Sequence, residues 1–107
     1  MTGPTWHRVA DSDSVAVGAV RIAKAGDHVV ALVRTEQGLG ALGNACPHMG
    51  GPLSQGTLED GRLVCPWHGR AYDPLSGECD GYAECAKSYP VEERSDGIYV
   101  AVTSLEV

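Results

Sequence analysis

Two short segments of the chain carry a cysteine, a proline and a histidine in almost the same order, and glycine follows in both. Residues 46–52 read CPHMGGP and residues 65–71 read CPWHGRA. Each segment offers one thiolate and one imidazole from a loop in which proline fixes φ and glycine lets the backbone come close to a neighbour. We call them the first box and the second box, and their repetition is the strongest constraint on the fold.

Most of the remaining sequence reads as short strands joined by tight turns. Apolar residues nowhere keep a helical period beyond a turn or two, and glycine ends the turns at residues 36–38, 59–61 and 95–97. We therefore predict an all-β domain with hairpins. The expected strands are residues 6–9, 17–22, 28–34, 39–42, 56–58, 62–64, 91–94 and 98–102.

The hairpin expected from residues 56–58 and 62–64 lies between the two boxes in the sequence. Because a hairpin returns the chain to its starting point, it should bring the boxes face to face. The turn residues of the hairpin and the spacing of the two boxes thus both favour a structure in which the boxes face each other.

Size and charge narrow the possible partners. The 107 residues suit a single domain over residues 1–107, and no apolar run approaches a membrane span. The first residues lack the basic head and apolar stretch of a secretory signal, so we expect a cytoplasmic protein. The net charge of −6 disfavours binding to nucleic acid and to anionic lipid. It favours binding to a basic patch on a partner protein.

The boxes supply the pattern C-x-H-x16-C-x2-H, whose ligands are Cys46, His48, Cys65 and His68. Zinc and iron are the candidate metals that both thiolates and imidazoles bind. A structural zinc site usually pairs two cysteines on one turn and two histidines on another. Here each box carries one of each, an arrangement that suits a two-iron cluster with different ends. A zinc-stapled binding module without redox activity stays open as an alternative.

The boxes resemble those of the Rieske [2Fe–2S] family, C-x-H and C-x2-H followed by glycine, and the resemblance extends over residues 42–102. It implies an antiparallel β-sandwich with a small cluster-binding β subdomain, and a [2Fe–2S] cofactor with two cysteine and two histidine ligands. It also implies that Cys46 and Cys65 bind the inner iron. His48 and His68 would bind the outer iron and leave one ring nitrogen of each at the surface.

The chain departs from high-potential members of this family at several positions. Those members carry a disulfide between the boxes where this chain has Gly51 and Trp67, and a serine where it has Arg70; their tyrosine is retained as Tyr72. Fewer hydrogen bonds to sulfur predict a reduction potential toward the low end of the family's range. Trp67 could cover the cluster, contact a partner or pack in the core.

The segment that follows the second box differs too. Many members cover the cluster with a proline-bearing loop, whereas residues 77–89 contain no proline, and Tyr82 could take that place. Cys79 and Cys85 are expected to be two thiols, although a disulfide between them is an alternative. His7 and His28 are assigned no metal role.

The resemblance implies a soluble one-electron carrier that passes electrons from a flavin-dependent reductase to a terminal oxygenase. The chain would be an electron-transfer component without a substrate site of its own, so whether to count it as an enzyme stays open. The alternatives are the small subunit of an assimilatory nitrite reductase, an excised oxygenase domain, a redox sensor and the zinc-stapled module.

Overall fold

The computed structural model describes residues 4–45, 51–67, 69–79 and 85–102. These residues form strands and two short 3-10 helices, which confirms the predicted all-β class. The strands are β1 (Thr5–Ala10), β2 (Val20–Ala25), β3 (His28–Thr35), β4 (Gly38–Gly43), β5 (Thr57–Glu59), β6 (Arg62–Val64), β7 (Ala71–Tyr72), β8 (Val91–Arg94) and β9 (Gly97–Val102), and the 3-10 helices are η1 (Ser12–Ser14) and η2 (Leu53–Gln55).

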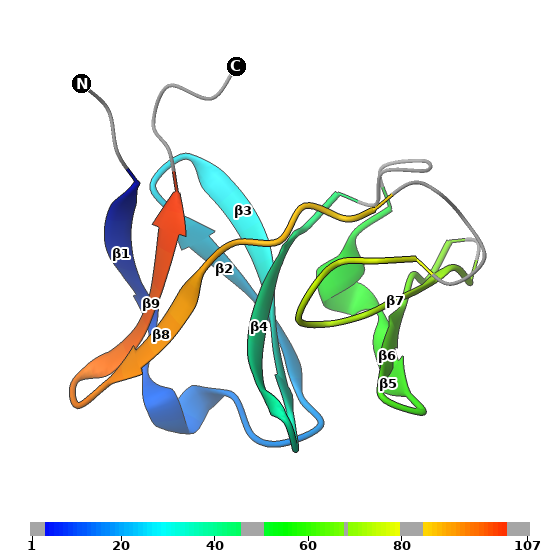
Figure 1. Cartoon of the computed structure of the whole chain (residues 1–107), viewed down its shortest axis with the longest axis horizontal. Coiled ribbons are helices and arrows are strands. Elements are labelled where there is room, and N and C mark those ends of the chain that lie inside the picture. Colours follow the sequence, from blue (N-terminus) through cyan, green and yellow to red (C-terminus); the bar gives the residue numbers. More distant parts are fainter. Residues whose placement is uncertain (1–3, 46–50, 68, 80–84, 103–107) are drawn as a thin grey trace.

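The strands form three antiparallel sheets, in the orders β1-β9-β8, β2-β3-β4 and β5-β6-β7. Figure 1 shows the β2-β3-β4 sheet between the other two, with the small β5-β6-β7 sheet on the side of β4. This arrangement confirms the predicted β-sandwich with a small additional β subdomain. The predicted hairpins β3–β4, β5–β6 and β8–β9 are also confirmed.

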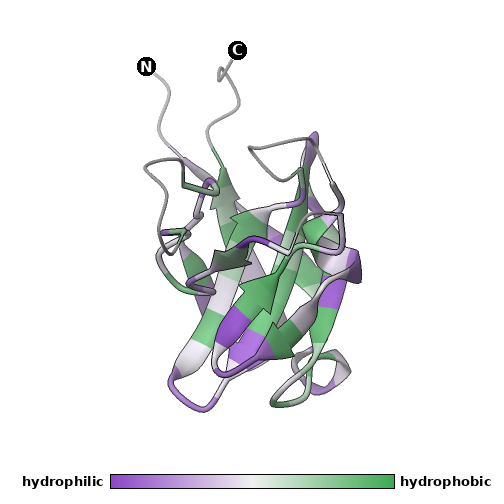
Figure 2. Ribbon diagram, turned by 90° about the vertical axis from the view of Figure 1, so that its right-hand side faces the viewer, coloured by the Kyte–Doolittle hydropathy of each residue, from purple (hydrophilic) through white to green (hydrophobic). Residues whose placement is uncertain are grey.

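Strand β3 explains why the sheets stack in this order. Its side chains alternate between two cores: Val30 and Leu32 pack with Ile98 and Val100 of β9, while Ala31 and Val33 belong to the core of the small subdomain. All four β3 residues are fully buried. Because successive strand residues point to opposite faces, one unbroken apolar run can fill both cores. Figure 2 shows the apolar stretches of neighbouring strands side by side in the interior.

One predicted strand is misplaced. We expected residues 17–22, but β2 begins at Val20 because a turn comes first, in which the N–H of Ala19 donates to the carbonyl of Ala16 over 2.9 Å. Gly18 in this turn has φ of 88°, a left-handed conformation that favours glycine. The helices η1 and η2 were not predicted either, since a single turn has no apolar period. Neither is long enough or apolar enough to cross a membrane.

An ion pair joins the central sheet to the sheet of β8. The guanidinium of Arg34, at the end of β3, donates two hydrogen bonds to Glu93 of β8 over 2.9 and 3.1 Å, and another to the carbonyl of Val15 over 2.5 Å. Arg34 lowers the pKa of the Glu93 carboxyl, chiefly through these hydrogen bonds. The contact fixes the loop around η1 against both sheets.

The turn after β7 is organised by Asp73. One carboxylate oxygen accepts hydrogen bonds from the backbone N–H groups of Leu75 (2.8 Å) and Ser76 (3.1 Å), and the other pairs with Arg62 of β6 at 3.1 Å. The Leu75 bond is the main cause of a lowered pKa at Asp73; burial opposes the shift, and Ser76 and Arg62 add to it. The turn is therefore tied to the strand that leads into the second box.

The same turn packs closely on β4. A Cβ placed on Gly40 would lie 2.0 Å from the carbonyl oxygen of Pro74, whereas the atom nearest to one placed on Gly43, the Cβ of Lys87, would be 3.6 Å away. The small subdomain and the central sheet thus approach each other backbone to backbone at Gly40, and a side chain there has no room.

The Gly40→Ala substitution should lower the free energy of unfolding by about 1–3 kcal/mol, because the Pro74 carbonyl has to move. Gly43→Ala is the matched control and should change it by less than about 0.5 kcal/mol. Urea unfolding of the two variants measures the difference. Equal midpoints would show that the two sheets are not packed tightly at Gly40.

Acid should weaken the contribution of Asp73. Because its folded pKa is lowered, the charge stabilises the fold above the unfolded pKa, near the ordinary value of 3.8, and this contribution is lost as the pH falls through the folded pKa. The difference in unfolding free energy between the parent and Asp73→Asn should therefore be constant near neutral pH and shrink below about pH 4. Glu93 is present in both proteins, so its own titration cancels. A difference that grows in acid would contradict the assignment.

Candidate metal centre

The first box joins the end of β4 to η2, and backbone contacts fix both of its ends. Ala45 and Pro52 form an antiparallel bridge, and the N–H of Leu53 donates to the carbonyl of Asn44 over 2.7 Å. The side-chain oxygen of Asn44 also accepts from the N–H of Ser54 over 2.8 Å. Cys46 and His48 lie between these ends, outside the described residues. The loop that carries them is closed at its base.

The second box begins directly after β6 with Cys65, whose surface is 2% exposed. Two backbone hydrogen bonds close the turn: the N–H of Cys65 donates to the carbonyl of Arg70 over 2.9 Å, and the N–H of Gly69 donates to the carbonyl of Cys65 over 3.0 Å. His68 lies outside the described residues. The turn thus holds the buried thiol in place through backbone bonds.

Gly69 has a local structural role in the second box. Its N–H donates to the carbonyl of Cys65 within the turn. Its φ of 73° is a left-handed conformation, which closes the turn and would strain other residues. Gly69 shapes the loop.

The two boxes meet at Gly51. A Cβ placed there would lie 3.0 Å from Sγ of Cys65 and 2.9 Å from Cγ of Trp67. Gly51 comes from the first box and the other two residues from the second. For these described residues, the predicted face-to-face arrangement of the boxes is confirmed. The family resemblance places Gly51 and Trp67 where other members join the boxes by a disulfide, so the closeness of these two residues agrees with it. The contact of Gly51 with the Cys65 sulfur was not predicted from the sequence.

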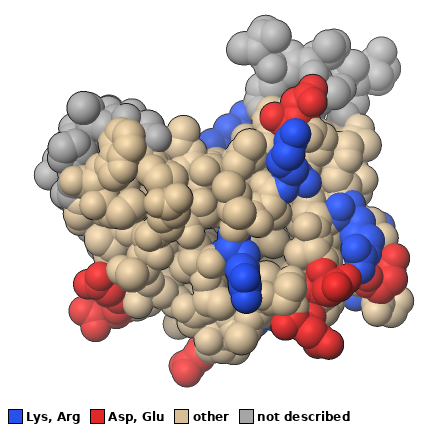
Figure 3. Space-filling view, turned by 180° about the vertical axis from the view of Figure 1, so that it is seen from behind, with Lys and Arg blue, Asp and Glu red and all other residues tan. Residues whose placement is uncertain are grey.

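Trp67 is 57% exposed, so the expectation that it could pack in the core is wrong. Its indole contacts the backbone of Gly51 on one side and is open to solvent on another. Figure 3 shows the molecule from behind, with the small sheet at the left. Few charged side chains lie on that end except along its lower edge, whereas acidic and basic side chains gather at the right.

Tyr72 is fully buried and pairs across the small sheet with Leu63. It belongs to the same apolar core as Cys65 and Cys79. Tyr72 therefore lies in the core to which the buried thiol belongs. Tyr82, the expected cover for the cluster, lies outside the described residues.

Cys79 and Cys85 have different surroundings. Cys79 forms an isolated antiparallel β-bridge with Tyr72 and is buried. Cys85 forms a β-bridge of the same kind with Glu78 and is exposed. Since consecutive residues 78 and 79 point to opposite faces, the two cysteines lie on opposite sides of the chain. A disulfide needs facing Cβ atoms, so this geometry disfavours a bond between them. That both are thiols stays a prediction.

The two remaining histidines contact residues outside the boxes. Nδ1 of His28 lies 3.4 Å from the hydroxyl of Tyr89, and their rings meet edge to face. Burial raises the pKa of Tyr89. A Cβ on Gly26 would meet Nε2 of His7 at 3.2 Å.

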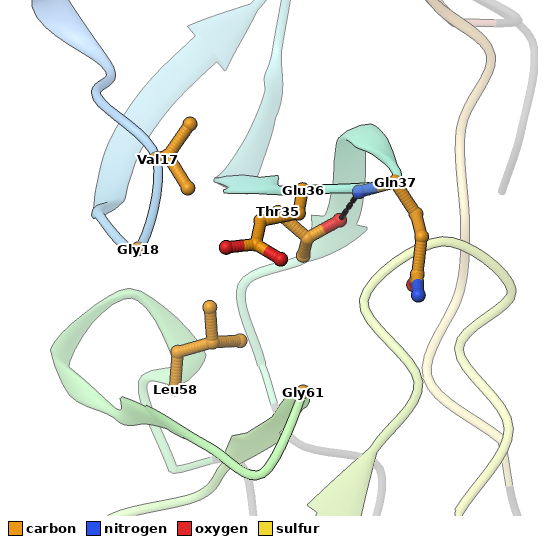
Figure 4. Close-up of a pocket in the computed structure, with 7 residues that line it drawn as sticks. All are labelled: Val17, Gly18, Thr35, Glu36, Gln37, Leu58 and Gly61. Atoms are coloured by element: carbon orange, nitrogen blue, oxygen red, sulfur yellow. Dashed lines mark hydrogen bonds between the residues drawn. The ribbon is translucent and has the colours of Figure 1, made fainter.

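An open pocket of about 280 Å³ lies between the β3–β4 turn and the β5–β6 hairpin. Leu58 points into it, and Gln37 at its rim donates a backbone hydrogen bond to the Thr35 hydroxyl over 3.1 Å (Figure 4). Glu36 is the charged residue among those that line it, and none of them is a cysteine or histidine. The lining residues are Val17, Gly18, Thr35, Glu36, Gln37, Leu58 and Gly61. The pocket is not a metal site.

The described part of the centre fits a group bound through sulfur. Cys65 is buried at the start of a turn closed by backbone bonds, and the glycine beside its sulfur lacks the Cβ that would block an approach. The donor set in the two boxes, two thiols and two imidazoles, is chemically suited to iron. Within the described residues no group of three or more His, Cys, Asp or Glu could hold a metal ion, and three of the four expected ligands lie outside them.

Known proteins resemble the chain in sequence and in structure. Apoptosis-inducing factor 3 of Homo sapiens is 33% identical over 85 residues, which are 78% of this chain and 14% of that protein. The chain therefore spans about a seventh of that relative's length. A chain in the complex of reduced oxygenase and oxidised ferredoxin in carbazole 1,9a-dioxygenase matches with a TM-score of 0.78 and 27% identity, over 94% of this chain and 97% of that one.

A third match concerns the fold alone. A structure from Mycobacterium tuberculosis, assigned as an NADH-dependent nitrite reductase small subunit, has a TM-score of 0.85 at 24% identity and covers 96% of this chain and 99% of that one. A family model described as the Rieske [2Fe-2S] domain matches residues 5–102. The chain therefore belongs to the Rieske [2Fe-2S] domain family, which implies a two-iron cluster held by two cysteines and two histidines.

Proposed function

We propose that the chain is a one-electron carrier that passes electrons from a flavin-dependent reductase to a terminal oxygenase. Its cluster ligands would be Cys46 and His48 from the first box and Cys65 and His68 from the second. When bound, the cluster accepts and releases one electron at a potential that the family places between about −150 and +300 mV.

The contact of Gly51 with Cys65 is the observation that carries this proposal. It joins the first box to the buried thiol of the second, in a chain whose family holds a two-iron cluster between such boxes. Backbone bonds fix the described ends of the first box and close the second box around Cys65. Ligands held in fixed positions favour fast electron transfer, because little rearrangement then accompanies a change of charge.

The proposed partners rest on charge and on the comparisons. The carbazole 1,9a-dioxygenase complex contains an oxygenase and a ferredoxin, and one of its chains resembles this chain at 27% identity. The net charge of −6 would speed the encounter with a basic surface on an oxygenase or a reductase. A cytoplasmic location remains part of the proposal.

The dithionite-reduced protein should show a rhombic electron paramagnetic resonance signal, with an average g value below that of all-cysteine clusters. Each chain should contain about two iron atoms and two acid-labile sulfides, the composition of this cluster type. Cys65→Ser should lose most of the iron, whereas Cys85→Ser, which changes an exposed cysteine, should keep it.

A colourless protein that contains zinc after anaerobic purification would overturn the electron-carrier proposal and favour the zinc-stapled module. Equal iron loss in the Cys65→Ser and Cys85→Ser proteins would overturn the ligand assignment alone. A single measurement of the iron and zinc contents of the purified proteins distinguishes these two outcomes.

Electron delivery can be tested by mixing the reduced chain with an oxidised Rieske oxygenase and following reoxidation in a stopped-flow instrument. The rate should fall as salt is raised from about 50 to 500 mM, because ions screen attraction between unlike charges. A rate that does not depend on salt would remove the electrostatic part of the proposal. Stable co-purification with a large reductase subunit would favour the nitrite reductase alternative.

A further inference from the structure

Trp67 and Gly51 form a contact that the electron-carrier role does not by itself require. Two of the three atoms nearest to a Cβ on Gly51 belong to the indole, Cγ at 2.9 Å and Cδ2 at 3.0 Å, and the third is Sγ of Cys65 at 3.0 Å. The backbone of the first box therefore lies in a notch made by one ring and one sulfur of the second box. Only a residue without a side chain fits there.

Burial shows what the indole does in this position. Trp67 is itself 57% exposed, yet the two residues beside it, Gly51 and Cys65, are buried. A large exposed ring that covers buried backbone removes water from that side of the contact and gains dispersion energy with it. The indole is placed to shield the thiol and to hold the first box against it.

We propose that the packing of Trp67 on Gly51 is a noncovalent clamp that locks the two boxes together and keeps the Cys65 sulfur in position to hold the cluster. The inference rests on the proposed ligand role of Cys65. Trp67 is a positioning residue in this scheme, because it acts through Gly51 and Cys65. It contributes shape, and it donates no ligand.

The clamp predicts that Trp67→Ala and Gly51→Ala each speed the loss of iron to an added chelator by about tenfold or more, as expected for residues that support metal ligands. The first variant opens the notch, and the second forces ring and sulfur apart. Bleaching of the cluster's visible absorbance after addition of a ferrous chelator measures the rate. Trp67→Phe keeps a ring on Gly51 and should stay within about threefold of the parent.

Two variants elsewhere serve as matched controls. Gly43→Ala adds the same methyl group where the nearest atom is 3.6 Å away, and Trp6→Ala removes a 38% exposed tryptophan that stacks with Arg94 on the β1-β9-β8 sheet. Both should lose iron at the parental rate. Any general loosening of the fold would instead appear in the controls as well.

The double variant distinguishes a clamp from two independent defects. Because most of the Gly51→Ala clash is with the indole, adding this change to Trp67→Ala should accelerate iron loss much less than it does in the parent. The average g value and the reduction potential should shift together in Trp67→Ala and recover in Trp67→Phe. A general loss of stability would not produce that recovery.

The outcomes separate the two proposals. A parent protein with no rhombic signal overturns the proposed function and the clamp with it. If the parent shows the signal and Trp67→Ala loses iron at the parental rate, the clamp alone is overturned. Rate increases that multiply in the double variant also overturn it.

Discussion

The burial of β3 on both faces is the constraint on which the rest of the structure depends. Val30 and Leu32 fill the core shared with β9, and Ala31 and Val33 fill the core of the small subdomain. One strand therefore holds both outer sheets in place. If either face lost its apolar residues, the layer packed against it would have no core to join, and the loops that leave that layer would lose their fixed positions.

Much of this fold can be predicted from the sequence, because the residue types in its turns determine where the hairpins form. Gly38, Gly61 and Gly97 each have positive φ in the turns where glycine was expected to permit it. The start of β2 was misjudged because the turn around Gly18 interrupts an apolar stretch that looks continuous. The stacking of the sheets depends on contacts between distant segments, which a local pattern does not encode.

The candidate site divides in the same way. The proposed ligand set follows from residue types and their spacing, since two thiols and two imidazoles are the side chains that hold a two-iron cluster in this family. The family resemblance places Gly51 and Trp67 where other members join the boxes by a disulfide, so it implies that the two positions lie close together, but not how a glycine and an indole pack there. Only the folded chain shows that a Cβ at this position would strike both the indole and the Cys65 sulfur. The chain is a Rieske domain of ferredoxin-like size whose boxes meet through packing.

A contact made by packing has no reduction potential of its own. A disulfide between two loops opens when the thiol pool around it becomes reducing enough, so its grip depends on the compartment. The indole and the glycine backbone share no bond that a thiol could attack. Their contact responds to temperature and to denaturants, which weaken apolar association. The chain can thus change oxidation state at its cluster while the joint that holds the cluster's loops stays chemically inert.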